Sequence, residues 1–569
     1  MFRLFKYLKN YKKQVIWGPI FKFTEAIFEL IVPLVMAKII DIGVNNRDTE
    51  YVLKMGGVLL ILSAAGFLFS ITCQYLASVA SQGFGTELRD EMFKKVNTFS
   101  FAEMDKFGSS SLVTRITNDV NQLQLAVAML IRLVVRAPFL VVGAVIMASI
   151  IDFKLSAIFL AASLLIAVIL YLIMSGSIPR YREIQKKMDK IMRISKENLE
   201  GTRVIRAFAR QDAEKTRFNE ASGDFTDATV NVGKISALLN PLTYLIVNAG
   251  IVAVLWFGGK NIFGGSLLRG ELIALINYMS QILLALVVVA NLVVLFTRAS
   301  ASAARVNEVM DTAPLITEGK LSHVPDGANK VSFENVRFSY GGKNVLDGIS
   351  FNAAKSHTIG IVGTTGSGKT TLISLIPRFY DVSEGAVLID GVNVKDYTFT
   401  ALRSKVGVVL QGAALFHGTV RENMKIGKEN ACDDEIKDAL KTAMAYEFVE
   451  KLPNGLDEVV SQSGVNLSGG QKQRLSIART LITKPEILIL DDSFSALDYV
   501  TEAKLRQSLR ENSRETTIFI ISQRIISVKY SDKILVMGNE KILDSGSHGE
   551  LYERCEEYRK LCMSQEVSL

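Results

Sequence analysis

Residues 363–370 read Gly363-Thr364-Thr365-Gly366-Ser367-Gly368-Lys369-Thr370, which satisfies the P-loop pattern. An apolar run at 358–362 precedes the loop and a helical pattern at 370–375 follows it, as a strand–loop–helix unit requires. Glycines let backbone N–H groups face phosphate oxygens, and a helix N-terminus favours negative charge. We therefore predict that the loop binds a nucleoside triphosphate, with Lys369 at the β- and γ-phosphates and Thr370 on Mg²⁺. A glycine-rich turn without a ligand is the alternative.

A second motif supports this prediction. The apolar run at 487–490 ends in Asp491-Asp492. A buried strand that ends in a carboxylate at the carboxyl edge of a sheet is what a Walker B motif needs to approach Mg²⁺, and Asp491 takes that role. Short β-rich runs, such as 331–338 and 517–521, alternate with helical patterns. We therefore predict an α/β fold with a largely parallel sheet.

The first 300 residues are far more apolar. A helix needs about 20 apolar residues to cross a bilayer. We predict six such spans, at 15–42, 52–77, 130–151, 155–176, 235–257 and 272–296. The alternative is a set of buried helices in a large soluble protein.

Loop charge predicts the orientation. If the N-terminus is cytosolic, the inside segments 1–14, 78–129 and 177–234 carry 23 Lys and Arg, whereas the opposite loops carry four. This asymmetry places both ends of the membrane domain in the cytosol. Two of the inside segments are too long for simple turns, so we expect the membrane helices to continue into the cytosol and to turn near 107–120 and 197–208.

The composition limits the other possibilities. The 569 residues are 49% hydrophobic, with a mean hydropathy of +0.26. The formal net charge of +8 is compatible with nucleic-acid binding. Basic cytosolic loops of a membrane protein give the same net charge, and the six predicted spans exclude a soluble nucleic-acid-binding protein. Four Cys and four His are dispersed without metal-ligand spacing, so a structural zinc site is not expected. We predict a membrane domain at 1–310, a linker at 311–329 and a nucleotide-binding domain at 330–569.

A third motif points to a family. Leu467-Ser468-Gly469-Gly470-Gln471 resembles the signature sequence of ATP-binding cassette (ABC) proteins. With six predicted spans ahead of it, the whole chain resembles an ABC exporter half-transporter. The fold class that this implies is an α-helical six-span membrane domain followed by an α/β P-loop ATPase domain of the ABC type.

The resemblance assigns roles to further residues. Tyr340 matches the aromatic residue that stacks on adenine, Gln411 the Q-loop glutamine that contacts Mg²⁺, and Ser495-Ala496-Leu497-Asp498 the D-loop. The turns at 107–120 and 197–208 resemble coupling helices. In this family two cassettes meet head to tail, so Ser468 and Gly470 act on ATP held by the partner. The candidate nucleotide-binding residues are Tyr340, Gly363, Thr364, Thr365, Gly366, Ser367, Gly368, Lys369, Thr370, Thr371, Gln411, Asp491, Ser468, Gly470 and Gln471, with Thr370, Gln411 and Asp491 at Mg²⁺.

The chain departs from the family pattern at the hydrolytic centre. Asp492 stands where a catalytic Glu is usual, which retracts the carboxylate by one methylene. Gln523 stands at the switch-histidine position and cannot carry a positive charge. Gln462 replaces an acidic residue ahead of the signature. These departures, beside an intact P-loop and signature, favour a heterodimer in which this chain's own site hydrolyses ATP slowly and its signature completes a partner's competent site.

Other functions remain open at this point. A homodimeric exporter of low activity and a nucleotide-gated regulatory or channel-like membrane protein are the alternatives. We expect an exporter of amphipathic small molecules, drugs or lipids, in a bacterial inner (plasma) membrane.

Several polar residues fall within the predicted spans. Glu25 and Glu29 share one face of the first span, and Arg132 and Arg136 lie four apart at the start of the third. These charges either form a polar lining or gating pair near the translocation path, or they lie near the membrane boundaries, extend to the interface, or pair with one another. Weaker candidates for cavity residues are Asn248, Asn277, Gln281 and Asn291.

Overall fold

The computed structural model describes residues 2–322, 327 and 329–565, so part of the predicted linker (323–326 and 328) lies outside the described residues. The chain forms two compact units. The first comprises Met1–Asn97 and Ser109–Thr312, and the second comprises Thr98–Gly108 and Ala313–Leu569. Each unit is described by itself.

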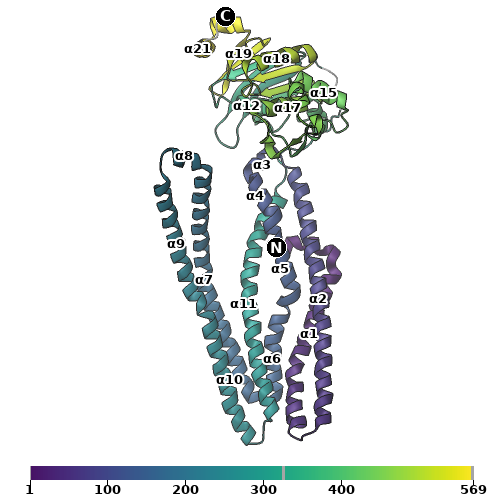
Figure 1. Cartoon of the computed structure of the whole chain (residues 1–569), viewed down its shortest axis with the longest axis vertical. Coiled ribbons are helices and arrows are strands. Elements are labelled where there is room, and N and C mark those ends of the chain that lie inside the picture. The colour runs from purple at the N-terminus through teal and green to yellow at the C-terminus, as the bar shows by residue number, and fades with distance from the viewer. Residues whose placement is uncertain (1, 323–326, 328, 566–569) are drawn as a thin grey trace. The chain divides into compact units, whose positions relative to one another are not determined.

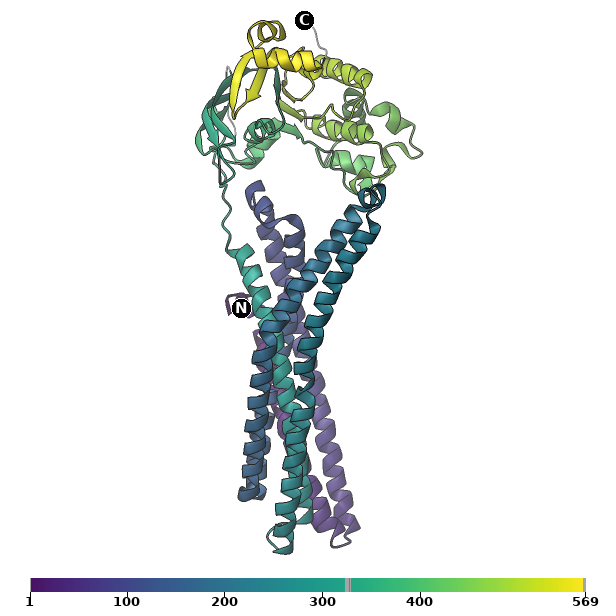
Figure 2. The ribbon, with the colours of Figure 1, turned by 90° about the vertical axis from the view of Figure 1, so that its left-hand side faces the viewer.

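The first unit is built of long helices. Helix α7 and the pair α9–α10 run side by side, joined through the short α8 (Figures 1 and 2). The helices are α1 (Lys12–Lys38), α2 (Thr49–Asn97), α4 (Ser109–Thr114), α5 (Val120–Met129), α6 (Arg136–Ile151), α7 (Phe153–Glu200), α8 (Thr202–Ala207), α9 (Gln211–Ala237), α10 (Leu239–Phe263) and α11 (Arg269–Asp311). A 3₁₀ segment precedes α1, and short π-helical turns at Ile39–Val44, Arg115–Asp119 and Leu130–Val134 interrupt the helical path.

Helices occupy all six predicted spans. Five helical stretches of the described chain are long and apolar enough to cross a membrane: Thr49–Asn97, Ser109–Ile151, Phe153–Glu200, Gln211–Phe263 and Arg269–Asp311. Helix α1 is also long enough at 27 residues, but it carries Lys22, Glu25 and Glu29. These three charges in the middle of the helix distinguish α1 from the other five stretches.

Small residues let these helices pack closely. A Cβ on Gly143 of α6 would come within 2.4 Å of a methyl carbon of Leu30 in α1, so this glycine brings the two helices together. The hydroxyl of Tyr278 in α11 donates a 2.6 Å hydrogen bond to the carbonyl oxygen of Leu30, which ties α11 to the same point. Side chains of α1, α6, α7, α10 and α11 form one hydrophobic core.

Three of the four charged residues that the sequence singled out in the spans, Glu25, Glu29 and Arg136, form ion pairs. Arg136 Nη2 lies 2.6 Å from Glu29 Oε2, which joins α6 to α1. Lys22 Nζ lies 2.6 Å from Glu25 Oε2 within α1. Glu29 and Arg136 therefore pair with one another, as one interpretation predicts, whereas Glu25 pairs with Lys22 instead. Arg132 donates a 3.5 Å hydrogen bond to the carbonyl oxygen of Gln74 and has no ion pair among the described residues. A mutual Arg–Glu pair inside the unit costs less than two isolated charges in an apolar setting.

The second unit contains the predicted α/β fold. A six-stranded sheet has the order β12-β11-β3-β10-β9-β6, in which only β12 runs antiparallel to its neighbour. An antiparallel sheet has the order β2-β1-β4-β5. The strands of these two sheets are β1 (Asn329–Phe338), β2 (Leu346–Ala354), β3 (Thr358–Gly363), β4 (Glu384–Ile389), β5 (Val392–Asn393), β6 (Val406–Val409), β9 (Ile487–Asp491), β10 (Thr517–Ile521), β11 (Lys533–Gly538) and β12 (Lys541–Gly546), and a short antiparallel pair joins β7 (Gly418–Thr419) to β8 (Val459–Val460).

Helices cover the parallel sheet, and every residue of β9 and β10 is buried, as expected for strands with both faces covered. The helices of this unit are α3 (Phe101–Phe107), α12 (Lys369–Ser374), α13 (Phe399–Lys405), α14 (Val420–Lys425), α15 (Asp433–Thr442), α16 (Tyr446–Glu450), α17 (Gly469–Leu481), α18 (Tyr499–Asn512), α19 (Ile525–Val528), α20 (His548–Arg554) and α21 (Glu556–Ser564). The predicted fold class is confirmed in both units.

Candidate nucleotide-binding site

The P-loop connects β3 to α12, as the sequence predicts. Strand β3 ends at Gly363 and α12 begins at Lys369. Gly368 has φ +90°, and a Cβ there would lie 2.9 Å from the carbonyl oxygen of Val345, so this position requires glycine. Thr364, Thr365 and Gly366 are the exposed part of the loop, at the end of a buried strand.

Lys369 is held inside the loop. Its Nζ donates hydrogen bonds to the carbonyl oxygens of Gly363 (2.9 Å) and Thr364 (2.8 Å). Burial lowers the pKa of Lys369 below its ordinary value, although Asp491 and Asp492 act in the opposite direction. A phosphate group beside this buried cation would stabilise its charged form, as the predicted role requires.

Asp491 and Thr370 meet at the end of β9. Thr370 Oγ1 donates a 3.2 Å hydrogen bond to Asp491 Oδ1. Asp491 is only 2% exposed, and its Oδ2 has no hydrogen-bond partner in the described part of the chain. Burial raises the pKa of Asp491, and Asp492 raises it further. A cation would satisfy the unpaired oxygen and favour the ionised carboxylate.

These oxygens fit a hard cation such as Mg²⁺. Across residues 2–322, 327 and 329–565, no group of three or more His, Cys, Asp or Glu side chains could hold a metal ion. Mg²⁺ typically binds one or two protein oxygens together with substrate phosphates and water, which matches a Thr370–Asp491 pair beside a P-loop. We keep the Mg²⁺ site as a prediction on this donor set.

Tyr340 lies beside the P-loop helix. Its hydroxyl is 3.1 Å from Thr371 Oγ1, and its ring packs edge-on against Phe338 and Tyr380, with centroids 4.8 Å and 5.2 Å apart. The side chain remains 57% exposed. These contacts hold the Tyr340 ring beside the P-loop and leave exposed surface on which an aromatic base can stack. Thr371 contributes by fixing the hydroxyl.

Two of the three departures from the family pattern, Asp492 and Gln523, follow neighbouring strands. Ile521, the last residue of β10, is in register with Asp491 on β9, so Asp492 and Gln523 both emerge at the carboxyl edge of the sheet. The amide of Asp492 donates a 3.0 Å hydrogen bond to the carbonyl oxygen of Ile521. Gln523 is exposed, and so is Gln411, which follows β6 on the far side of β9.

Comparison with known proteins agrees with this geometry. Residues 15–286 match the model of the ABC transporter transmembrane region, and residues 346–495 match the model described as ABC transporter. An uncharacterised ABC transporter ATP-binding protein of Mycobacterium tuberculosis is 38% identical, over 99% of this chain and 98% of the relative. The chain belongs to the ABC transporter family. Its second unit is accordingly an ATP-binding ATPase domain.

Two further matches also span nearly the whole of this ABC transporter. An ATP-dependent lipid A-core flippase of Chromohalobacter salexigens is 32% identical, over 96% of this chain and 95% of the flippase. A solved bacterial Atm1-family ABC exporter with ATP bound has the same fold, with a TM-score of 0.81 at 24% identity over 98% of this chain and 99% of that one. The chain thus has the architecture of an ABC exporter half-transporter, a multi-pass membrane protein, and exporters of this family generally work as dimers.

The ABC signature segment begins a helix. Ser468 is the N-cap of α17: its Oγ accepts a 3.3 Å hydrogen bond from the amide of Gln471, and Gln471 Oε1 accepts one of 2.8 Å from the amide of Ser468. Helix α17 packs in one hydrophobic cluster with α14 and α15, whereas α12 of the P-loop packs in another. Ser468 and Gln471 are partly or fully accessible at the surface, with Gly470 half-buried between them.

The first cytosolic turn of this ABC transporter lies earlier in the chain than the sequence predicted. Helix α3 belongs to the same compact unit as the ATPase domain, whereas residues from Ser109 onward belong to the first unit, so the predicted turn at 107–120 overlaps α3 and its C-cap by two residues only. Ser100 and Glu103 form a capping box that starts α3, and this Ser-x-x-Glu pattern could have located it. The second predicted turn, 197–208, contains α8.

Contacts of α3 reach the predicted adenine-stacking residue. Phe101 stacks on Phe379 with ring centroids 4.4 Å apart, and Tyr380 donates a 2.7 Å hydrogen bond to Asp105 Oδ2. Burial raises the pKa of Tyr380, and Asp105 adds to this. Because the Tyr380 ring also packs against Tyr340, α3 lies one side chain away from the aromatic residue beside the P-loop.

A second contact that the sequence did not predict fixes the loop of Gln523. Gln565 Nε2 donates a 2.8 Å hydrogen bond to the carbonyl oxygen of Gln523, and Gln565 Oε1 accepts one of 2.8 Å from the amide of Ile525. The side chain just beyond α21 therefore fastens the loop on both sides of Arg524. A single glutamine about 40 residues from its partners leaves no pattern in the sequence.

Proposed function

We propose that this chain is one subunit of a heterodimeric, ATP-driven exporter. Its own P-loop forms a site that binds Mg–ATP and hydrolyses it slowly, and its signature segment completes a competent site on a related partner subunit. The observation that carries the proposal is the joint placement of Asp492 and Gln523 at one sheet edge beside an otherwise complete P-loop and Walker B pair.

The chemistry of these two residues supports slow hydrolysis. Asp492 retains a carboxylate but ends one methylene short of a glutamate, and a displacement of about 1 Å in a catalytic group can cost about 10²-fold in rate. Gln523 can donate a hydrogen bond but offers no positive charge to a leaving phosphate. In contrast, Lys369, Thr370 and Asp491 keep the parts needed for binding, so binding and hydrolysis are separated in this site.

Head-to-tail pairing of two cassettes would explain why the signature segment is accessible at the surface. Ser468, Gly470 and Gln471 would approach ATP bound to the partner. The partner's signature would likewise close over this chain's P-loop, with Tyr340 on the adenine and Gln411 near Mg²⁺. ATP then joins the two chains, and its hydrolysis at the competent site releases them.

For transport, we propose export of amphipathic small molecules or lipids by alternating access. The similarity to a lipid A-core flippase supports a lipid-like cargo. We further propose a bacterial inner membrane location with both termini in the cytosol, on the 23-to-four distribution of basic residues.

Purification of the full chain alone and measurement of its ATPase rate tests the proposal. We expect Mg–ATP binding with very slow turnover, and a rise of about 10²-fold when Asp492→Glu and Gln523→His are combined. Lys369→Ala in the same background is the control and should return the rate to baseline. Turnover by the unmodified chain alone at the rate of a complete transporter would instead support a homodimer.

A further inference from the structure

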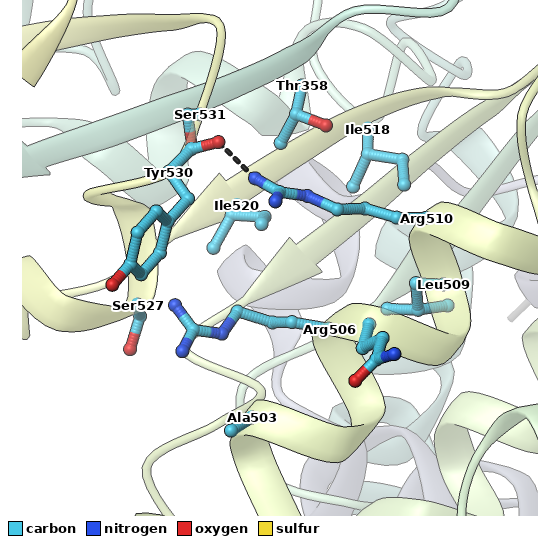
Figure 3. A pocket seen from close by; sticks show the side chains of 11 residues that line it. Thr358, Ala503, Arg506, Leu509, Arg510, Ile518, Ile520, Ser527, Tyr530 and Ser531 are labelled. Carbon is cyan, nitrogen blue, oxygen red and sulfur yellow. Dashed lines mark hydrogen bonds between the residues drawn. The ribbon is translucent and has the colours of Figure 1, made fainter.

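A pocket of about 330 Å³ lies in the ATPase unit, between α18 and the turn after α19 (Figure 3). It is separate from the nucleotide site. Thr358, the first residue of β3, lines the pocket, whereas the P-loop starts at Gly363 at the other end of the same strand. With about 3.3 Å per residue, the two sites are roughly 17 Å apart along β3.

Two arginines of α18 form one wall. Arg506 and Arg510 are one helical turn apart, and Figure 3 shows both reaching towards the turn that carries Tyr530 and Ser531. Arg506 Nη1 donates a hydrogen bond to the carbonyl oxygen of Ile526, and Arg510 Nη2 donates one to that of Tyr530. These bonds fix both guanidinium groups in place while each retains further N–H donors.

The pocket also contains buried donors without acceptors. Within the described part of the chain, neither Arg506 Nε nor Ser531 Oγ has a hydrogen-bond partner, although both atoms are shielded from solvent. Ser531 is only 8% exposed. Buried polar atoms nearly always have partners, so two such atoms on the wall of one pocket indicate a missing acceptor.

Charge identifies the kind of acceptor. Of the eleven described residues that line the pocket, two are arginines and none is acidic. Two carboxylates flank the lining: Asp532 is bonded to the amide of Thr358 at 2.7 Å, and the buried Glu502 accepts a 2.6 Å hydrogen bond from Ser527 and lies 3.8 Å from Arg524. A water molecule could satisfy the orphan donors, whereas an anion would also pair with the two guanidinium groups, whose hydrogen bonds to Ile526 and Tyr530 are made to neutral carbonyl oxygens.

The floor of the pocket is apolar. The side chains of Leu509, Ile518 and Ile520 are buried beneath the arginines, and the ring of Tyr530 stands at the opening. The volume is at the lower end of the range for small-molecule sites. We infer that this pocket binds a small organic anion, a carboxylate or phosphomonoester joined to a short apolar or aromatic body.

Such a ligand would bridge two functional segments. Helix α18 directly follows the D-loop residues Ser495–Asp498, and α19 directly follows the loop of Gln523. A bound ligand would therefore contact α18 between Ala503 and Arg510 and α19 at Ser527, within the two helices that follow these segments.

Ligand-observed NMR titration of the full chain in lipid nanodiscs tests the inference. A saturating non-hydrolysable ATP analogue fills the nucleotide site, so a phosphate probe cannot bind there. The probes are phenyl phosphate and benzoate, with benzyl alcohol as the neutral analogue. We expect saturable binding of at least one anion, with the difference between the two identifying the headgroup, and at least tenfold weaker binding of benzyl alcohol.

Substitutions locate the binding. Arg506→Gln and Arg510→Gln should each weaken binding about tenfold, and Arg514→Gln, at an exposed arginine outside the pocket, should leave it unchanged. Because both arginines also bind backbone carbonyls, Ser531→Ala serves as a variant that keeps them, and it should weaken binding about threefold. Absence of saturable anion binding, equal binding of benzyl alcohol, or binding that none of the three pocket variants alters would overturn the inference.

Discussion

Tyr380 donates a 2.7 Å hydrogen bond to Asp105, a residue 275 positions earlier in the chain, and this bond fastens α3 to the ATPase domain. The Tyr380 ring simultaneously supports Tyr340 edge-on. One side chain thus contacts both a segment that follows a membrane helix and the predicted adenine platform.

Removal of the Tyr380 ring should weaken nucleotide binding. Aromatic pairs contribute about 0.5–1.5 kcal/mol beyond burial, so Tyr380→Ala should lower ATP affinity by up to about tenfold as Tyr340 loses its support. Tyr380→Phe keeps the ring and removes only the bond to Asp105, so its affinity should stay within twofold of the unmodified chain. Binding of a fluorescent ATP analogue measures both, and equal losses in the two variants would contradict the role of the ring.

Gln565 should control the mobility of the loop that carries Gln523. Gln565→Ala removes both hydrogen bonds, each worth about 1 kcal/mol, so hydrogen exchange of peptides covering 522–526 should accelerate about fivefold or more. Gln565→Glu can still accept from the amide of Ile525 but cannot donate to Gln523, so it should show an intermediate rate. Unchanged exchange in Gln565→Ala would exclude the predicted fastening.

Protonation of Glu103 at acidic pH should weaken the attachment of α3 to the rest of the second unit. This residue is 1% exposed, and although burial opposes ionisation, hydrogen bonds from Ser100 and from the amide of Leu315 hold its pKa below the ordinary value of 4.5. Its stabilising contribution is therefore complete above pH 4.5 and is lost as the pH falls through the lower folded-state pKa.

Comparison with Glu103→Gln isolates this effect. The unmodified chain should unfold at a higher temperature than the variant near pH 7, and the difference should shrink below about pH 4.5. Thermal unfolding in one detergent across this range measures it. A difference that grows on acidification would have the wrong sign for a lowered pKa.

In the first unit, Arg305 and Asp119 should differ in their effects on stability. Asp119 is 1% exposed and accepts hydrogen bonds from Arg305 Nε at 2.8 Å and from Ser302 Oγ at 3.0 Å. Arg305→Ala leaves a buried, unpaired carboxylate, which typically costs about 3–5 kcal/mol. Asp119→Ala leaves a half-exposed arginine that water can solvate, so its cost should be smaller, about 1–3 kcal/mol.

Thermal unfolding of the two single variants ranks these costs. Arg298→Ala, at an exposed arginine two turns earlier in α11, is the matched control and should change the unfolding temperature little. An equal or larger loss in Asp119→Ala would contradict the predicted ranking of the two costs.

The parts of the structure that the sequence predicted depend on local spacing. The P-loop and the Asp491 strand could be located because a buried strand that ends in a loop or carboxylate leaves a contiguous pattern, and parallel pairing then brings both to one sheet edge. The six spans could be located for the same reason, since each is a continuous stretch of predominantly apolar residues.

Contacts between distant short segments could not be predicted in this way. Helix α3 has seven residues and too little periodicity to indicate which domain it joins. The ion pair between Glu29 and Arg136 could not be distinguished from a polar lining of the translocation path. A sequence shows that a span contains charges, but it does not show which side chains they contact. The placement of Gln565 depends on the packing of α21, which only the folded domain determines.

The inclusion of residues 98–108 in the second unit means that the two halves of the molecule are interleaved along the chain. No single cut in the polypeptide separates them. A fragment that starts at residue 313 loses the stacking partner of Phe379 and exposes that aromatic surface, which makes such a fragment prone to self-association. To produce the second unit by itself, residues 98–108 should therefore be fused to the fragment that starts at residue 313.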